Sequence, residues 1–238
     1  MKHILITGGN KGLGEHISLA LLNEGYSVYC LSRSETQSEV LTSNSNYFWF
    51  SYDLGQSDKI EQFIKKHPIL NKVAFDGLVN NSAIAYDDIV SNLKYTPILE
   101  MFNVNVFSAM ALTRYIIRKG LLKKKQVSIV HISSVSVHTA YKGLSMYASS
   151  KGAIEAFSKG VAREWGEMGV RSNCVVPGFM ETGMSESLSS SQKDRIYKRT
   201  SLKKATSLES VADTVAFLLS DKAKSITGQS IMVDNGTI

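Results

Sequence analysis

The chain has 238 residues, of which 43% are hydrophobic and 20% are charged, and its formal net charge is +6 at pH 7. This length and apolar content suit one large core, so we expect a single domain over residues 1–238. The sequence has no run of eighteen apolar residues, which argues against a membrane-spanning helix, and no nucleic-acid-binding motif accompanies the positive charge. We therefore expect a protein that binds neither membrane nor nucleic acid.

The amino-terminal segment predicts a phosphate-binding loop. Residues 2–6 form an apolar strand that runs into Thr7-Gly8-Gly9-Asn10-Lys11-Gly12-Leu13-Gly14 and then into an apolar periodic stretch. Strand, glycine-rich turn and helix are the parts of a dinucleotide site. Gly8 permits the tight turn, Gly12 lets the backbone approach a pyrophosphate, and Gly14 lets the helix pack closely on the strand. Since the strand starts at residue 2, we expect no signal peptide ahead of it.

Strand-like and helix-like segments alternate along the rest of the chain. We expect strands at 2–6, 26–31, 47–51, 76–80, 127–132, 171–176 and 230–233, and helices near 13–24, 57–66, 97–118, 146–168 and 208–219. This alternation predicts an α/β fold: a Rossmann-type doubly wound parallel sheet flanked by helices, in a single domain. The polar segment 181–207 departs from the alternation and reads as a solvated, mobile segment.

The two cysteines indicate a reducing compartment. Cys30 and Cys174 lie in apolar strand-like runs, so we expect buried free thiols rather than a disulfide, and a cytoplasmic protein. No cluster of Cys and His has the spacing of metal ligands, and we expect no metal site.

Tyr147 and Lys151 are the first candidates for catalysis. A spacing of four places both side chains on one face of the predicted helix 146–168. Free tyrosine has a pKa of about 10, which makes it a poor acid or base at neutral pH. A lysine ammonium one turn away favours the phenolate and is expected to bring the pKa of Tyr147 toward the working pH.

These motifs together resemble the short-chain dehydrogenase/reductase family over nearly the whole chain. Thr7-Gly8 with Gly12 and Gly14 matches its cofactor motif, and Tyr147-x-x-x-Lys151 matches its catalytic motif. Ser134 lies thirteen residues before Tyr147, as is usual in the family, and Asn105 matches its catalytic asparagine. Further matches are 176–182, which closes over the nicotinamide, and 226–236 around the last strand. Asn80-Asn81-Ser82-Ala83 departs from the usual Asn-Asn-Ala-Gly, but both substituted residues are small, so the strand end can still run close to the cofactor.

The resemblance implies a role for each catalytic candidate. Ser134 and Tyr147 would hydrogen-bond the substrate oxygen, and Tyr147 would exchange the proton. Lys151 would lower the tyrosine pKa and bind the nicotinamide ribose, and Asn105 would hold a water that connects Lys151 to solvent. The segment 181–207 becomes a lid over the substrate.

The same resemblance implies a nicotinamide cofactor, and the residues favour NADP(H) over NAD(H). No acidic residue ends the second strand; Arg33 follows it, and an arginine there accommodates a 2'-phosphate. Lys11 is a second cation facing that pocket in related enzymes, while Asp53 and Leu54 resemble the adenine-contacting pair. The expected cofactor-binding residues are Thr7, Gly8, Asn10, Lys11, Gly12, Leu13, Gly14, Arg33, Asp53, Leu54, Asn81, Ser82, Ala83, Tyr147, Lys151, Pro177, Gly178 and Thr182.

The substrate is left open by the sequence. The runs 175–182 and 226–229 look like those of 3-oxoacyl-acyl-carrier-protein reductases, which implies a 3-oxoacyl thioester and an acidic acyl carrier protein as partner. Lys123-Lys124-Lys125 and the basic lid suit such a partner, although a charge run is usually a solvated face. Relatives with the same motifs act on sugars, polyols, steroids or small ketones. A dinucleotide-binding protein without turnover is the third alternative.

Assembly is predicted from the helix that carries Tyr147. Ala148, Ala153, Ile154, Ala156, Phe157 and Val161 give this helix more apolar surface than one sheet face covers. The last strand, 230–233, would be an exposed edge in a monomer. In relatives these surfaces meet their copies, so we expect a homotetramer, with a dimer as the fallback.

Overall fold

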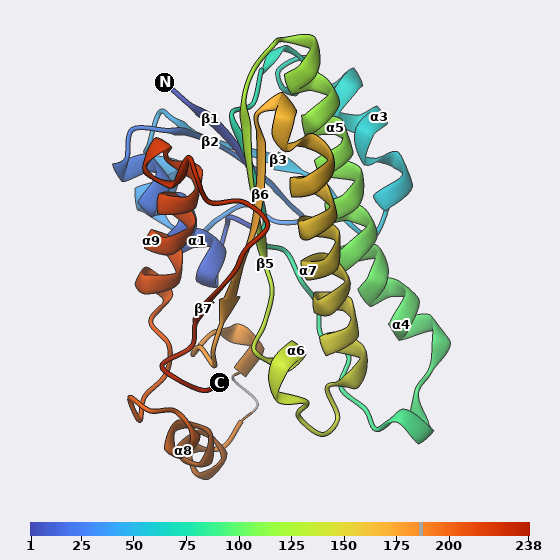
Figure 1. Ribbon diagram of the computed structural model, residues 1–238, viewed down its shortest axis with the longest axis vertical. Coiled ribbons are helices and arrows are strands. Elements are labelled where there is room, and N and C mark those ends of the chain that lie inside the picture. The colour runs from blue at the N-terminus through green and yellow to red at the C-terminus, as the bar shows by residue number, and fades with distance from the viewer. Residues whose placement is uncertain (186–187) are drawn as a thin grey trace.

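The computed structural model describes residues 1–185 and 188–238. Within them, seven strands form one parallel sheet in the order β3-β2-β1-β4-β5-β6-β7, with helices on both faces (Figure 1). The predicted doubly wound α/β fold is confirmed. The strands are β1 (His3–Thr7), β2 (Ser27–Ser32), β3 (Tyr47–Ser51), β4 (Gly77–Asn80), β5 (Val127–Ile132), β6 (Val170–Pro177) and β7 (Ser230–Val233).

Two hydrophobic clusters, one on each face, hold the helices to the sheet. Ile4 and Ile6 of β1 pack toward α1 (Gly12–Asn23) and α9 (Leu208–Leu219), whereas Leu5 between them packs toward α3 (Ile60–Lys66) and α5 (Ser108–Leu122). Helix α7 (Ser145–Trp165) lies beside α5 on that second face (Figure 1). Because side chains alternate along a strand and both faces are covered, the central strands are apolar at nearly every position.

The strand order places the candidate site at the carboxyl ends of β1, β4, β5 and β6. The chain runs from β1 outward to β2 and β3, and then returns to β4 on the other side of β1. The loops after β1 and β4 therefore leave the sheet in opposite directions. In open parallel sheets, ligands bind at the carboxyl ends beside such a switch in direction.

Each predicted strand end is within one residue of the observed end, but the helices differ more. The helix predicted at 97–118 is three pieces: α4 (Tyr95–Phe102), a π-helical turn (Asn103–Phe107) and α5. Three helices were missed: α2 (Glu39–Thr42), α6 (Ser136–Thr139) and α8 (Ser190–Arg199). The first two are too short to show periodicity.

Helix α8 occupies part of the segment predicted as a solvated segment or a lid. The sequence did not predict this helix, because it has too few apolar residues to show periodicity, although the reciprocal cap between Ser189 and Gln192 marks its start. Residues 186 and 187 of the predicted lid 181–207 lie outside the described residues. The remaining short elements are 3-10 turns: Ser57–Lys59, Leu70–Lys72, Val90–Asn92, Gly166–Met168, Gly183–Ser185 and Asp221–Ala223.

Cys30 and Cys174 are free and buried, as predicted. Across the described parts of the chain, no helix has the length and apolar character needed to cross a membrane. Over the same residues, no group of three or more His, Cys, Asp and Glu side chains is arranged to hold a metal ion.

Candidate active site

The glycine-rich loop lies between β1 and α1, and two of its glycines are dictated by geometry. A Cβ at position 14 would lie 1.8 Å from the carbonyl oxygen of Gly8, so the first turn of α1 packs against the loop at a distance that no side chain permits. Gly12 adopts a left-handed φ of 54°, and no heavy atom lies within 4 Å of the Cβ that it lacks. The loop therefore leaves open space at the start of α1.

The end of β4 holds this loop in place. The hydroxyl of Thr7 accepts hydrogen bonds from the backbone amides of Asn81 and Ser82, each at 3.0 Å. In return, the side-chain amide of Asn81 donates to the carbonyl oxygens of Thr7 and Gly8, also at 3.0 Å. The small residues at 82 and 83, where the family pattern has Ala-Gly, thus leave this connection intact.

The amino terminus of α1 suits an anion. Its cap residue, Lys11, makes no side-chain hydrogen bond to the first turn, and the free amides of a first turn bind phosphate well. Asn10 joins this loop to the end of β2, because its side-chain amide donates to the carbonyl oxygen of Ser34 at 3.0 Å. Lys11 and Arg33 each lie next to one partner of that bond, and both are exposed. The structure thus brings the two predicted cations to one edge of the loop.

Asp53 and Leu54 follow β3 at the same edge of the sheet but face different surroundings. The Asp53 carboxylate is exposed and accepts a hydrogen bond from the amide of Gly55 at 3.0 Å. Leu54 is 6% exposed and packs in the cluster on the α3 and α5 face. Its buried side chain therefore contributes to the core of the sheet.

Tyr147, Lys151 and Ser134 converge where β5 ends against α7. The Ser134 side chain lies close enough to the Tyr147 hydroxyl to favour its ionisation, and the Ser134 hydroxyl accepts a hydrogen bond from the amide of Ser136 at 3.2 Å. The ammonium of Lys151 lies 5.8 Å from the centre of the tyrosine ring and donates to the carbonyl oxygen of Ile132 at 2.8 Å. Lys151 is 3% exposed. The two residues belong to the same helix, and the Lys151 ammonium is thus held at the end of β5 close to the tyrosine ring.

Burial dominates the ionisation of both groups. It raises the pKa of Tyr147 to about 12; the nearby Ser134 side chain opposes this rise, and the charge of Asp87 adds to it. Burial lowers the pKa of Lys151 to about 8. The prediction that Lys151 brings the pKa of Tyr147 toward the working pH is wrong for this structure, because burial of the phenol dominates and the ammonium donates to the carbonyl of Ile132. At neutral pH the phenol is protonated and is a proton donor.

Asn105 lies in the π-helical turn and is bound by its neighbours. Its side chain donates to the carbonyl oxygen of Ile84 and accepts from the amide of the same residue, both at 2.9 Å. It also donates to the hydroxyl of Ser150 at 3.0 Å. Both amide hydrogens are therefore used within the protein, and the side chain ties the loop after β4 to α7. The predicted water would therefore have to donate to the side-chain oxygen of Asn105, which already accepts one hydrogen bond.

Pro177 and Gly178 end β6 beside the base of the predicted lid. The carbonyl oxygen of Pro177 accepts from the amide of Val135 at 3.0 Å, next to Ser134. A Cβ at Gly178 would lie 2.6 Å from the hydroxyl of Thr206, so the two ends of the lid segment meet there. Thr182, further along, accepts a hydrogen bond from the amide of Ser185 at 2.8 Å.

The lid segment around α8 is fastened to its surroundings and to the carboxyl-terminal tail. Tyr197 donates a hydrogen bond to Glu181, and the Arg199 guanidinium lies 5.9 Å from the ring centre of Tyr141, on the loop before α7. After β7, the side-chain amide of Asn235 donates to the carbonyl oxygens of residues 204 and 205 at 3.0 and 2.8 Å. The lid segment thus contacts the loop that leads to Tyr147.

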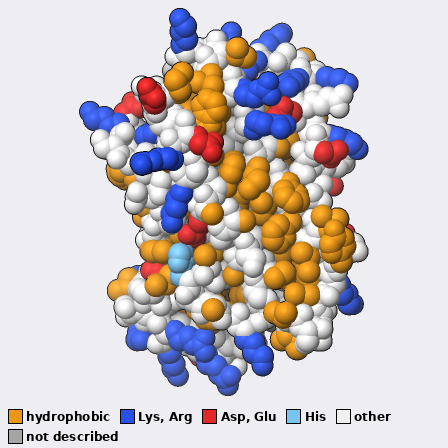
Figure 2. All heavy atoms as spheres, turned by 45° about the vertical axis from the view of Figure 1, so that its right-hand side comes forward, with side chains coloured by type: hydrophobic (Ala, Val, Ile, Leu, Met, Phe, Trp, Pro, Cys, Tyr) orange, Lys and Arg blue, Asp and Glu red, His pale blue; other side chains and the backbone are white. Residues whose placement is uncertain are grey.

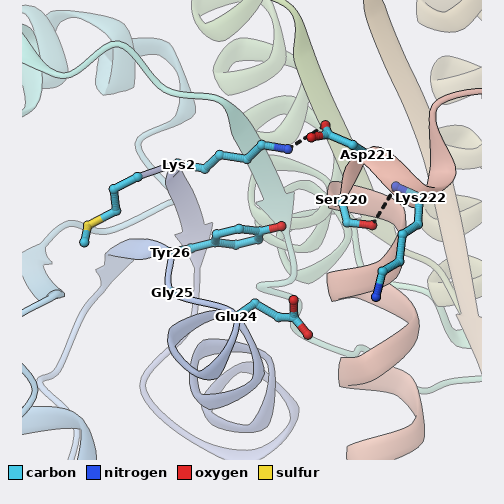
Figure 3. Close-up of a pocket in the computed structure, with 8 residues that line it drawn as sticks. Lys2, Glu24, Gly25, Tyr26, Ser220, Asp221 and Lys222 are labelled. Atoms are coloured by element: carbon cyan, nitrogen blue, oxygen red, sulfur yellow. Dashed lines mark hydrogen bonds and ion pairs between the residues drawn. The ribbon is translucent and has the colours of Figure 1, made fainter.

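A separate cavity of about 420 Å³ lies at the opposite, amino-terminal end of the sheet (Figure 3). Figure 3 shows Lys2 reaching Asp221, with Tyr26 between the two helices that end there. The Lys2 ammonium and the Asp221 carboxylate are 2.7 Å apart. None of the predicted site residues lines this cavity.

Three contacts at the site were not anticipated from the sequence. Asp87 affects the ionisation of Tyr147, Ser150 binds Asn105, and the carbonyl of Ile132 receives Lys151. Ser150 lies inside the Tyr147-x-x-x-Lys151 motif, so the sequence indicates that it is near the site, whereas Asp87 belongs to no motif. A backbone acceptor such as Ile132 carries no sequence signal.

Comparison with known proteins places this geometry in a family. A family model described as enoyl-(acyl carrier protein) reductase matches residues 8–237. The chain is 34% identical over 240 residues to the 3-oxoacyl-(acyl-carrier-protein) reductase FabG of Buchnera aphidicola subsp. Acyrthosiphon pisum, a match that covers 97% of this chain and 95% of that protein.

Solved structures agree on the fold and differ in their nucleotides. 4-Hydroxyisoleucine dehydrogenase complexed with NADH superposes with a TM-score of 0.93 at 25% identity, covering 100% of this chain and 98% of that one. ElxO with NADP bound superposes with a TM-score of 0.89 at 27% identity, covering 99% of this chain and 98% of that one.

Proposed function

The chain belongs to the short-chain dehydrogenase/reductase family of NAD(P)-dependent oxidoreductases, and from that premise we propose that it reduces a carbonyl substrate with NADPH. The observation that carries the proposal is the contact of the Tyr147 hydroxyl with Ser134 above the buried ammonium of Lys151. A protonated phenol beside a second hydroxyl can bind a carbonyl oxygen by two hydrogen bonds and donate the proton that turns this oxygen into a hydroxyl group.

The site residues have defined tasks in the proposed reaction. The nicotinamide, when bound, supplies the hydride. Ser134 and Tyr147 bind the carbonyl oxygen, and Tyr147 gives it a proton as negative charge develops there. The phenolate left behind is stabilised by the Ser134 hydroxyl and by the positive charge of Lys151, which retains its proton below a pKa of about 8. Asn105 holds the loop after β4 against α7 by its bonds to Ile84 and Ser150.

The choice of NADP(H) rests on Lys11 and Arg33. Both are exposed and flank the bond between Asn10 and Ser34, and β2 ends without an acidic residue. Two cations at this edge favour the dianionic 2'-phosphate over a ribose hydroxyl. The uncapped start of α1 and the open space at Gly12 fit the pyrophosphate.

For the substrate we infer a 3-oxoacyl thioester, presented by an acidic acyl carrier protein. The full-length similarity to 3-oxoacyl-(acyl-carrier-protein) reductase supports this class. Lys123, Lys124 and Lys125 precede β5 and therefore lie at the end of the sheet opposite Ser134, about 20 Å away along a six-residue strand. Lys125 is also paired with Asp76 at 2.8 Å. The cations of α8 lie nearer the site, which favours the lid as the docking surface.

A keto-sugar or other small ketone is the second candidate. It is favoured by the superposition on 4-hydroxyisoleucine dehydrogenase, which covers the whole chain. Such a substrate needs no carrier, so its turnover would be insensitive to the charges of α8.

The test is NADPH oxidation by the purified protein against β-ketoacyl thioesters, keto-sugars and small ketones. We expect turnover of the thioesters, and Tyr147→Phe is expected to lower the rate by at least about 10²-fold because it removes the proton donor. Tyr26→Phe, at the opposite end of the sheet, is the matched control. Wild-type turnover in Tyr147→Phe would refute the assignment, and turnover of keto-sugars or small ketones alone would select the second candidate.

The assembly that we propose is a homotetramer. A groove of about 710 Å³ runs between α5 and α7, with Phe107, Met110, Phe157 and Trp165 among its lining residues. Figure 2 shows apolar side chains gathered on this face of the molecule. The edge strand β7 leaves Met232 39% exposed. Two such surfaces on one chain support two isologous interfaces.

A further inference from the structure

A buried carboxylate lies one helical turn beyond Lys151. Glu155 is on α7 and is 6% exposed. A carboxylate removed from water is costly unless donors surround it, and a well-packed apolar residue would fill the same space without that cost. Its surroundings therefore indicate what it is for.

Three side chains from three different elements surround Glu155. The hydroxyl of Ser133, after β5, lies 2.5 Å from one carboxylate oxygen, and the Nε2 atom of His138, on α6, lies 3.2 Å from the same oxygen. The hydroxyl of Ser230, at the start of β7, donates to the other oxygen at 3.1 Å. The carboxylate thus connects α7 to the end of β5, to α6 and to the edge strand.

Two of these partners flank Ser134. Ser133 directly precedes it, and His138 lies on the helix that follows it. The backbone of the segment is already paired with β6, because Ser133 donates to Val175 at 2.8 Å and Val135 donates to Pro177 at 3.0 Å. Those bonds fix the segment to the sheet. Glu155 fixes it to α7, the helix that carries Tyr147.

We propose that Glu155 is a positioning residue that sets the separation of Ser134 and Tyr147. The proposal rests on the proposed carbonyl reduction. Tyr147 and Glu155 are eight residues apart on one helix, about 12 Å along its axis, so the carboxylate and the phenol form one rigid unit. By holding both flanks of Ser134, Glu155 brings the serine hydroxyl to the substrate oxygen that Tyr147 protonates.

The expected effect is on the chemical step. A misplacement of about 1 Å lowers a rate by up to about 10²-fold, so Glu155→Leu should reduce kcat about 10- to 100-fold. KM for NADPH should stay unchanged, because Glu155 contacts none of the residues proposed to bind the nucleotide phosphates. Glu155→Gln keeps an acceptor for Ser133 and His138 and should recover most of the rate. Glu167→Leu, at an exposed position beyond the same helix, is the control.

A double-mutant cycle on the carbonyl substrate separates positioning from a general structural role. If Glu155 acts through Ser134, then Glu155→Leu has little further effect in a Ser134→Ala background. Should Glu155→Leu fail to fold, Ser133→Ala with His138→Phe removes the two polar groups at this carboxylate oxygen instead and enters the same cycle. Additive losses, or a normal kcat in Glu155→Leu, would overturn this inference alone. Wild-type protein without turnover on any carbonyl would overturn the proposed function as well.

Discussion

Replacing Lys151 by methionine should abolish carbonyl reduction and stabilise the fold. The lysine is buried, and its pKa falls from an ordinary 10.5 to about 8 because burial disfavours the ammonium. Each pKa unit corresponds to about 1.4 kcal/mol, so keeping Lys151 charged in the folded protein costs about 3 kcal/mol. Loss of the hydrogen bond to Ile132 offsets about 1 kcal/mol of the gain. We expect Lys151→Met to be more stable by about 2 kcal/mol at pH 7.

This advantage depends on pH, and the sign follows from the shifted pKa. Above pH 8 the folded wild type loses the proton of Lys151, while the unfolded chain keeps it up to 10.5. The unfolded state therefore binds more protons in this window, so the stability of the wild type rises with pH there. The difference between the two proteins should shrink from pH 8 toward 10.5.

Thermal unfolding at equal protein concentration, without added nucleotide, measures the effect. For a chain of this size a gain of about 2 kcal/mol raises Tm by about 4–8 °C. Lys159→Met, at an exposed position on the same helix, is the control and should leave Tm nearly unchanged. A less stable Lys151→Met protein at pH 7, or a gap independent of pH, would refute the reasoning.

The other predictions concern the nucleotide, the pH profile and assembly. Arg33→Ala combined with Lys11→Ala should weaken NADPH binding at least about tenfold, since charge-assisted contacts contribute about 1.5–3 kcal/mol each, and should barely change NADH binding. Fluorescence titration measures both affinities, and equal losses for NADPH and NADH would show that these cations do not recognise the 2'-phosphate. In the direction of reduction, kcat/KM should fall as pH rises through about 8, where Lys151 loses its proton; a rate that is flat to pH 10 contradicts this. Light scattering should give about four times 26.2 kDa, and Phe107→Glu should shift the protein toward smaller species; a stable, active wild-type monomer at micromolar concentration would contradict the assembly.

Much of the architecture was predictable because it rests on local patterns. The apolar runs that became β1 and β5 are bounded by Thr7 and Ser133, so both their ends and the loops that follow were visible in the sequence. The spacing of Tyr147 and Lys151 placed both on one helix because helical geometry is regular. Motif positions therefore predicted which residues gather at the carboxyl ends of the strands.

The rest depends on contacts between distant segments. The π-helical turn around Asn105 adds one residue to a helical turn, which apolar periodicity does not reveal. The raised pKa of Tyr147 reflects its burial and its distance from groups such as Asp87, neither of which is encoded by a spacing of four. Helix α8 is polar except at Ile196 and Tyr197, so its pattern resembles that of a loop.

The positions of the two chain ends determine how the protein is best handled. Asn235, close to the carboxyl terminus, holds the base of the lid segment, whereas Met1 lines the cavity at the opposite end of the sheet. A purification tag or surface tether joined after Ile238 would pull on the lid, and the measured turnover would report the attachment as well as the enzyme. A tag at the amino terminus does not load the lid segment, so tags for kinetic measurements and tethers for immobilisation are better attached there.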